Sequence, residues 1–76
     1  MVTVKDIEVL MDDFFIERKE KFFEIKRYLL SEFNWKLDKT KNTQFVIRGI
    51  PIEDNREISD ILVSFLPDEV ILLKEI

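Results

Sequence analysis

Apolar residues recur at helical spacing along the first part of the chain. Stepped by 100° per residue, they form one stripe on a helix: Val4, Ile7, Met11, Phe14, Phe15, Phe22, Ile25, Leu29 and Phe33. No Gly or Pro interrupts the pattern, and Thr3 with Asp6 three residues later is typical of a capping box at its start. The pattern predicts one long helix over about residues 4–32, with a length of ~42 Å.

A second set of apolar residues recurs at every seventh position on another side of this predicted helix. The set consists of Val9, Ile16, Phe23 and Leu30. A helix packed on one sheet does not need a second apolar stripe, and monomers seldom expose a long apolar patch. Because two helices meet along a seam with this spacing, we predict an isologous homodimer with Phe23 as its central anchor. A foreign partner on the same stripe, or cover by the chain itself, is the alternative.

Charged residues complete the predicted partner-binding site. Arg18 lies near the centre of the first stripe, where a charge must reach solvent or a carboxylate. It either lies beyond the sheet, paired with an acidic neighbour, or belongs to an interface, since interfaces are enriched in arginine. Lys26 flanks the second stripe. The predicted partner-binding residues are Val9, Ile16, Arg18, Phe23, Lys26 and Leu30.

The remaining sequence predicts a small sheet and one more helix. Residues 33–38 alternate apolar and polar, and residues 43–50 are rich in β-branched and aromatic side chains, which favours an antiparallel hairpin. Asp54 and Glu57 form a second candidate capping box, before a helix over residues 55–66. Residues 69–75 are apolar on both sides, as in a central strand. A strand–helix–strand run of this length indicates a right-handed crossover with parallel strands.

The predicted fold is therefore α+β with the order α-β-β-α-β, in a single domain of 76 residues. A long N-terminal helix packs on a small three-stranded mixed sheet, with a second short helix beside it.

The composition argues against catalysis. Cys and His are absent, which removes disulfides, thiolate metal sites and the commonest general base. The only carboxylate cluster is Asp12, Asp13, Glu17, Glu20 and Glu24. We interpret it as a solvated helix face, with a divalent cation site or a DNA-mimicking ridge as alternatives. We expect no enzymatic activity, no cofactor, no metal and no small-molecule substrate.

The charge is unevenly distributed. The chain has a net charge of −4, yet residues 34–49 contain Lys36, Lys39, Lys41 and Arg48 against a single acidic residue. Cations near Trp35 and Phe45 indicate an alternative function, a nucleic-acid-binding module using this basic β-hairpin. Alternation, however, directs the two aromatic rings inward and the cations outward, and nucleic-acid-binding domains are usually basic overall.

The start of the chain lacks the features of a secretory signal, and no apolar run approaches the length of a membrane span. We expect a cytoplasmic protein. By analogy with other small acidic proteins, the leading hypothesis is a non-enzymatic protein–protein interaction module: an adaptor, regulator or inhibitor of a larger protein that associates through its first helix.

Overall fold

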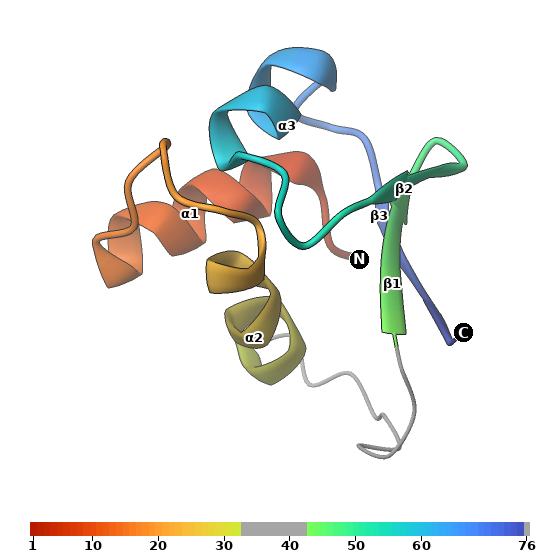
Figure 1. Cartoon of the computed structure of the whole chain (residues 1–76), viewed down its shortest axis with the longest axis horizontal. Helices are drawn as coiled ribbons and strands as arrows, with labels where there is room; N and C mark the ends of the chain where they lie inside the picture. The colour runs from red at the N-terminus through yellow and green to blue at the C-terminus, as the bar shows by residue number, and fades with distance from the viewer. Residues whose placement is uncertain (33–42, 76) are drawn as a thin grey trace.

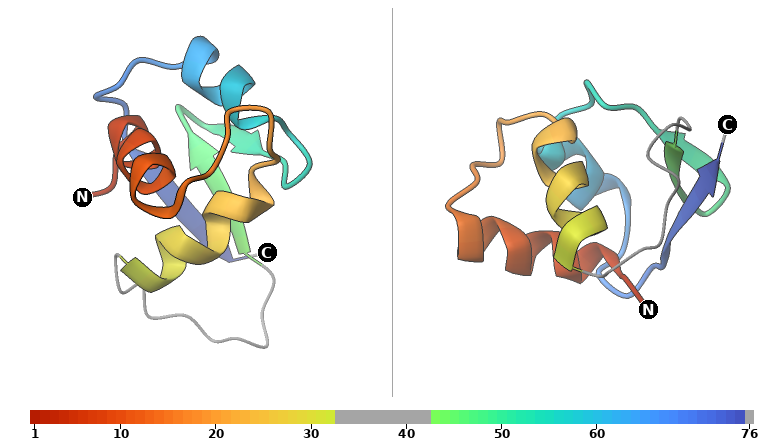
Figure 2. Two further views of the ribbon diagram at one scale, coloured as in Figure 1. Left: turned by 90° about the vertical axis from the view of Figure 1, so that its left-hand side faces the viewer. Right: turned by 90° about the horizontal axis from the view of Figure 1, so that it is seen from below.

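The computed structural model describes residues 1–32 and 43–75, with the side chain of residue 75 excluded. Its elements are α1 (Val4–Phe14), α2 (Phe23–Glu32), β1 (Thr43–Ile47), β2 (Ile50–Ile52), α3 (Ile58–Ser64) and β3 (Ile71–Glu75). All of these helices lie on one side of the three-stranded sheet (Figures 1 and 2). The α+β class is confirmed, whereas several of the predicted elements are wrong.

The predicted long helix is replaced by two helices. α1 ends at Phe14 and α2 begins at Phe23, running across α1 (Figure 2). A straight helix of ~42 Å would exceed the largest dimension of the molecule, which is 29 Å. The turn instead places Phe22, Ile25 and Leu29 in the core, fully buried. Burying such a side chain contributes about 1.5–3 kcal/mol, which outweighs continuing the helix.

The α1–α2 connection (residues 15–22) is held in place by backbone pairing with the segment that leads into α3. Bonds of 2.8–3.0 Å run from Phe22 N–H to Arg56, Phe23 N–H to Asp54, Ile58 N–H to Glu20 and Ser59 N–H to Arg18. The carbonyl groups of Asp54 and Arg56, before α3, thus accept from N–H groups at the start of α2. The carbonyl groups of Arg18 and Glu20, before α2, accept in turn from N–H groups at the start of α3. N–H groups at the start of a helix have no acceptor within the helix. These backbone hydrogen bonds therefore satisfy them in place of side-chain caps.

One of the two predicted capping boxes is present. The Asp6 carboxylate accepts from the backbone N–H of Thr3 at 2.7 Å, and α1 begins at the next residue. The predicted box at the second helix is wrong. α3 begins at Ile58 after Glu57, which makes no side-chain cap bond, and Asp54 instead accepts from Lys26.

The sheet has the order β2-β1-β3 and is antiparallel throughout. β1 and β2 join through Arg48 and Gly49, whose φ values of 54° and 74° suit a tight two-residue hairpin turn. β2 is short and contains Pro51, so its sequence does not read as a strand. Because the chain reverses direction at β2 before it passes through α3, β3 is antiparallel to β1. The expected crossover with parallel strands is therefore wrong.

The expected first strand, residues 33–38, lies outside the described residues. From Phe45 to Ile47, β1 pairs with β2 on one side and with β3 on the other. Phe45 points inward as predicted and meets Phe22 edge-on, with 5.5 Å between ring centroids. Among the described residues, every buried side chain is apolar.

Candidate partner-binding surface

The apolar residues of the predicted partner-binding site are divided between separate elements. Val9 of α1 and Phe23 of α2 are 47% and 52% exposed. Ile16 lies in the α1–α2 connection and Leu30 in α2, and both are half-buried against the core. The expected stripe along one helix, and the seam between two such helices, therefore lose their geometric basis.

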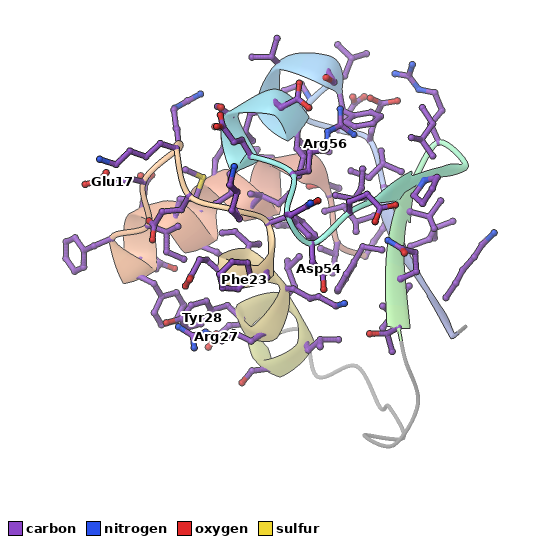
Figure 3. The ribbon with its side chains drawn as sticks, viewed as in Figure 1. Glu17, Phe23, Arg27, Tyr28, Asp54 and Arg56 are labelled. Atoms are coloured by element: carbon purple, nitrogen blue, oxygen red, sulfur yellow. The ribbon has the colours of Figure 1, made fainter. Side chains whose placement is uncertain are left out.

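Lys26 has an intramolecular role. Its Nζ donates to the Thr43 carbonyl and to Asp54 Oδ1, each at 3.1 Å, and its side chain is only 18% exposed. The ammonium group thereby joins α2 to the start of β1 and to the segment after β2 (Asp54 is labelled in Figure 3). Lys26, a predicted partner-binding residue, thus contacts two other parts of the chain through its ammonium group.

The residue at the end of α1 is unusual. Phe15 adopts a left-handed conformation with φ 56° and ψ 41°, and Ile16 N–H closes onto the Met11 carbonyl at 2.9 Å. Helices usually place Gly or Asn at such a position, because other residues incur a cost of about 1–2 kcal/mol. The Phe15 side chain is 92% exposed. The sequence pattern assigned it to the core, and that assignment is wrong.

A pocket of about 480 Å³ lies between α1 and the start of the α1–α2 connection. It is lined by Glu8, Met11, Asp12, Ile16, Glu17 and Arg18. The α1 residues share one face of the helix because they are spaced three and four apart. Met11 and Ile16 provide apolar walls that are continuous with the core. Figure 3 shows Glu17 on the connection, above the end of α1.

The charged groups of this pocket have few partners. Within residues 1–32 and 43–75, Glu8, Asp12 and Arg18 take part in no ion pair, so the expected pairing of Arg18 with an acidic neighbour is absent there. Glu17 pairs with Lys19 at 3.2 Å, but both side chains are mostly exposed. Exposed pairs of this kind contribute little to stability, so the pocket charges remain available to a ligand.

The neighbouring Phe14 is held by α2. Its ring stacks on Tyr28 with 4.2 Å between centroids, and the Arg27 guanidinium lies 5.1 Å from the Tyr28 ring (Figure 3). This stack fixes the end of α1 against α2 and contributes about 0.5–1.5 kcal/mol beyond burial. The exposed Phe15 therefore follows a residue that is packed against α2.

The predicted carboxylate cluster does not form one face, because it is divided by the α1–α2 connection. Asp12 and Glu17 line the pocket, Glu20 accepts from Glu17 N–H, and Glu24 pairs with Arg27. In the described part of the chain, acidic residues do not gather into a group that could hold a metal ion. The cation-site alternative therefore gains no support.

Most of the basic residues proposed for the nucleic-acid alternative lie outside the residues that the structure describes. Lys36, Lys39 and Lys41 lie outside the described residues. Arg48 is in the β1–β2 turn, where it forms an ion pair with Glu69 and lies 5.8 Å from the Phe65 ring. A hydrogen bond from Leu66 N–H, together with Arg48, lowers the pKa of Glu69. This part of the predicted basic hairpin is already neutralised within the chain.

No family model, curated protein or solved structure matches this chain. The function must therefore be argued from the surface itself.

The sequence pattern identified Arg18 and Ile16 as partner-binding residues, and both line the pocket. It missed Glu8, Met11 and Phe15. The available signal was Arg18 in the middle of an apolar stripe, within an unbroken run of charges over residues 17–21. No helix in the described parts of the chain is long and apolar enough to cross a bilayer.

Proposed function

We propose that this chain is a small non-enzymatic protein–protein interaction module, an adaptor, regulator or inhibitor of a larger protein. It docks through the α1-end surface, which we define as Phe15 with the pocket residues Glu8, Met11, Asp12, Ile16, Glu17 and Arg18. This proposal keeps the helix-based association that the sequence indicated, but moves it from a stripe along the helix to the helix end.

The observation that carries the proposal is Phe15. The folded chain gains almost nothing from burying this ring, because 92% of the residue is exposed. It also incurs the conformational cost of a bulky residue at a left-handed position. A partner that covers the ring would recover about 1.5–3 kcal/mol of burial. Large aromatic anchors of this kind dominate the energetics of protein interfaces.

The surroundings of Phe15 also suit a protein interface. Interface cores are enriched in aromatic residues, Met and Arg, and are surrounded by a polar rim. Here Met11 and Ile16 form apolar walls, and charged groups surround them. The Phe14–Tyr28 stack keeps this region in one arrangement, so a partner would not have to order it on binding.

Charge favours a foreign partner over a second copy. α1 contains four acidic side chains against Lys5 as its only basic one, and the whole chain has a net charge of −4. Two copies that met through α1 would bring like charges together, which costs affinity. A partner with a basic surface meets no such penalty and is attracted from a distance.

Site-specific photo-crosslinking in native cells tests this proposal. Phe15 is replaced with the photoreactive amino acid benzoylphenylalanine, and Asp68, an exposed residue between α3 and β3, is replaced in a matched control. We expect a light-dependent adduct with one foreign protein from position 15 and none from position 68. An adduct with the mass of two copies would show self-association instead, and the absence of any protein adduct at position 15 would refute the interaction.

A further inference from the structure

We infer that the pocket between α1 and the α1–α2 connection receives a lysine or arginine side chain of the partner protein. This inference rests on the proposed function and gives the chemistry of the partner residue. It follows from the combination of apolar walls and unpaired carboxylates in one pocket.

The walls of the pocket fit the stem of a basic side chain. Met11 is 7% exposed and belongs to the core, and Ile16 packs against that core. Lysine and arginine have aliphatic stems that pack on such apolar surface while their charged heads stay in contact with polar groups. A short polar side chain would leave these walls uncovered.

The carboxylates fit the head of that side chain. Glu8 and Asp12 are four residues apart on α1, and neither forms an ion pair with a described residue. Like charges at this spacing repel each other along a helix. A cation placed between them would remove that repulsion and form charge-assisted hydrogen bonds. The pair therefore has a cost in the isolated chain that a basic partner residue relieves.

The remaining groups select against other occupants. An apolar residue would cover carboxylates without offering them a donor, which is unfavourable. An acidic residue would meet Glu8, Asp12 and Glu17 at short range. Among the described residues, Arg18 is the only cation that lines the pocket, and its guanidinium can donate to a backbone carbonyl of the partner beside the inserted residue.

Peptide titration followed by nitrogen–proton NMR spectroscopy tests the inference. The probes are three short capped peptides of alanine and leucine, identical except for a central arginine, glutamine or glutamate. We expect the arginine peptide to shift amide signals of residues 8–18 and not those of β3. Its affinity should exceed that of the glutamine peptide at least about tenfold, and should fall as salt rises from about 50 to about 500 mM. Equal binding of the three peptides, or shifts confined to another surface, would overturn the inference.

A pair of charge-matched variants separates pocket chemistry from net charge. Glu8→Gln with Asp12→Asn removes the two pocket charges and keeps their shape. Glu53→Gln with Asp68→Asn removes two exposed carboxylates that form no ion pair with a described residue. We expect the first pair to weaken binding of the arginine peptide at least about fivefold and the second to change it less than about twofold. Equal losses would show a general charge effect and overturn the inference.

The two proposals fail in different ways. If the adduct from position 15 persists in the Glu8→Gln, Asp12→Asn variant at the wild-type level, and the arginine peptide shows no preference, the interaction module stands and the basic-anchor inference is wrong. If position 15 gives no protein adduct, the proposed function itself is wrong.

Discussion

Two phenylalanine doublets, Phe14–Phe15 and Phe22–Phe23, lie at the two ends of the α1–α2 connection, and their inner members, Phe15 and Phe22, differ completely in exposure. Phe22 is fully buried and meets Phe45 edge-on at 5.5 Å, whereas Phe15 is 92% exposed in a left-handed conformation. The doublets have the same side chains and similar spacing to the helix ends, so residue type does not decide the outcome. Position relative to the sheet does, because Phe22 lies where α2 turns back onto the sheet and Phe15 lies where α1 leaves it.

The polar groups around the two doublets differ in the same way. Near Phe22, backbone N–H groups bond to carbonyl groups of the segment that leads into α3, and Lys26 bridges to Thr43 and Asp54. Near Phe15, the charges of Glu8, Asp12 and Arg18 have no ion pairs among the described residues. One region is saturated with internal partners and serves stability. The other contains charged side chains without an ion-pair partner among the described residues, as expected of a docking surface.

The largest effect should come from the buried ring of Phe22. Phe22→Ala removes a fully buried ring and leaves a cavity against Phe45. We expect the free energy of unfolding to fall by about 3–5 kcal/mol in urea denaturation. That is a large share of the stability of a small domain. A loss below 1 kcal/mol would mean that the contrast between the doublets is not real.

Lys26 sharpens the contrast on the polar side. Lys26→Met keeps the length of the stem but removes the donor to the Thr43 carbonyl and to Asp54. Because Asp54 is half exposed, we expect a loss of only about 1 kcal/mol in the same denaturation assay. Lys74→Met, at an exposed lysine of β3, is the control and should stay within about 0.5 kcal/mol of wild type. Equal losses of stability in Lys26→Met and Lys74→Met would show that the contacts of Lys26 do not stabilise the fold, and Lys26 would again be a candidate partner-binding residue.

Phe15 should respond in the opposite direction. Asn tolerates the left-handed conformation better than Phe, so Phe15→Asn should raise the free energy of unfolding by about 0.5–1 kcal/mol. The matched change at the same connection, Phe23→Asn, replaces a half-exposed ring at the start of α2 and should not be stabilising. A destabilised Phe15→Asn variant would show that the ring contributes to the fold.

The smallest effect concerns Glu69, which accepts from Leu66 N–H and pairs with Arg48. These contacts lower the pKa of Glu69 in the folded state. Its carboxylate therefore stabilises the fold above the unfolded pKa, and this contribution disappears as pH falls through the folded pKa. The stability difference between wild type and Glu69→Gln should shrink between about pH 6 and about pH 3. A difference that is constant with pH would contradict this.

Several parts of the fold follow from local sequence. The Thr3–Asp6 capping box places the start of α1, and the apolar residues Ile58, Ile61 and Phe65, which are three and four residues apart, are buried. The end of α1 does not follow, because neither Gly nor Pro marks it. It depends on backbone pairing between the connection and residues 54–59, which are distant in sequence. Such tertiary contacts override helix propensity.

The sheet shows the same limit. β1 and β3 have clear apolar patterns, whereas β2 consists of Ile50, Pro51 and Ile52. A prediction that omits this short strand places β3 parallel to β1, whereas the structure has it antiparallel. One undetected strand therefore changes the predicted topology. At the candidate site, Arg18 on an apolar stripe indicated an exception to the pattern. The pocket itself could not be foreseen, because it exists only where the connection folds back along α1.

Competition in the crosslinking assay tests the central claim most directly. The chain with benzoylphenylalanine at position 15 is irradiated with its partner in the presence of excess unlabelled competitor, either wild type or Phe15→Asn. Because Phe15→Asn retains the fold but lacks the ring, we predict that wild type suppresses the adduct and that the variant requires at least about tenfold more protein to do so. Equal suppression by both competitors would contradict the claim that the end of α1 is a docking surface.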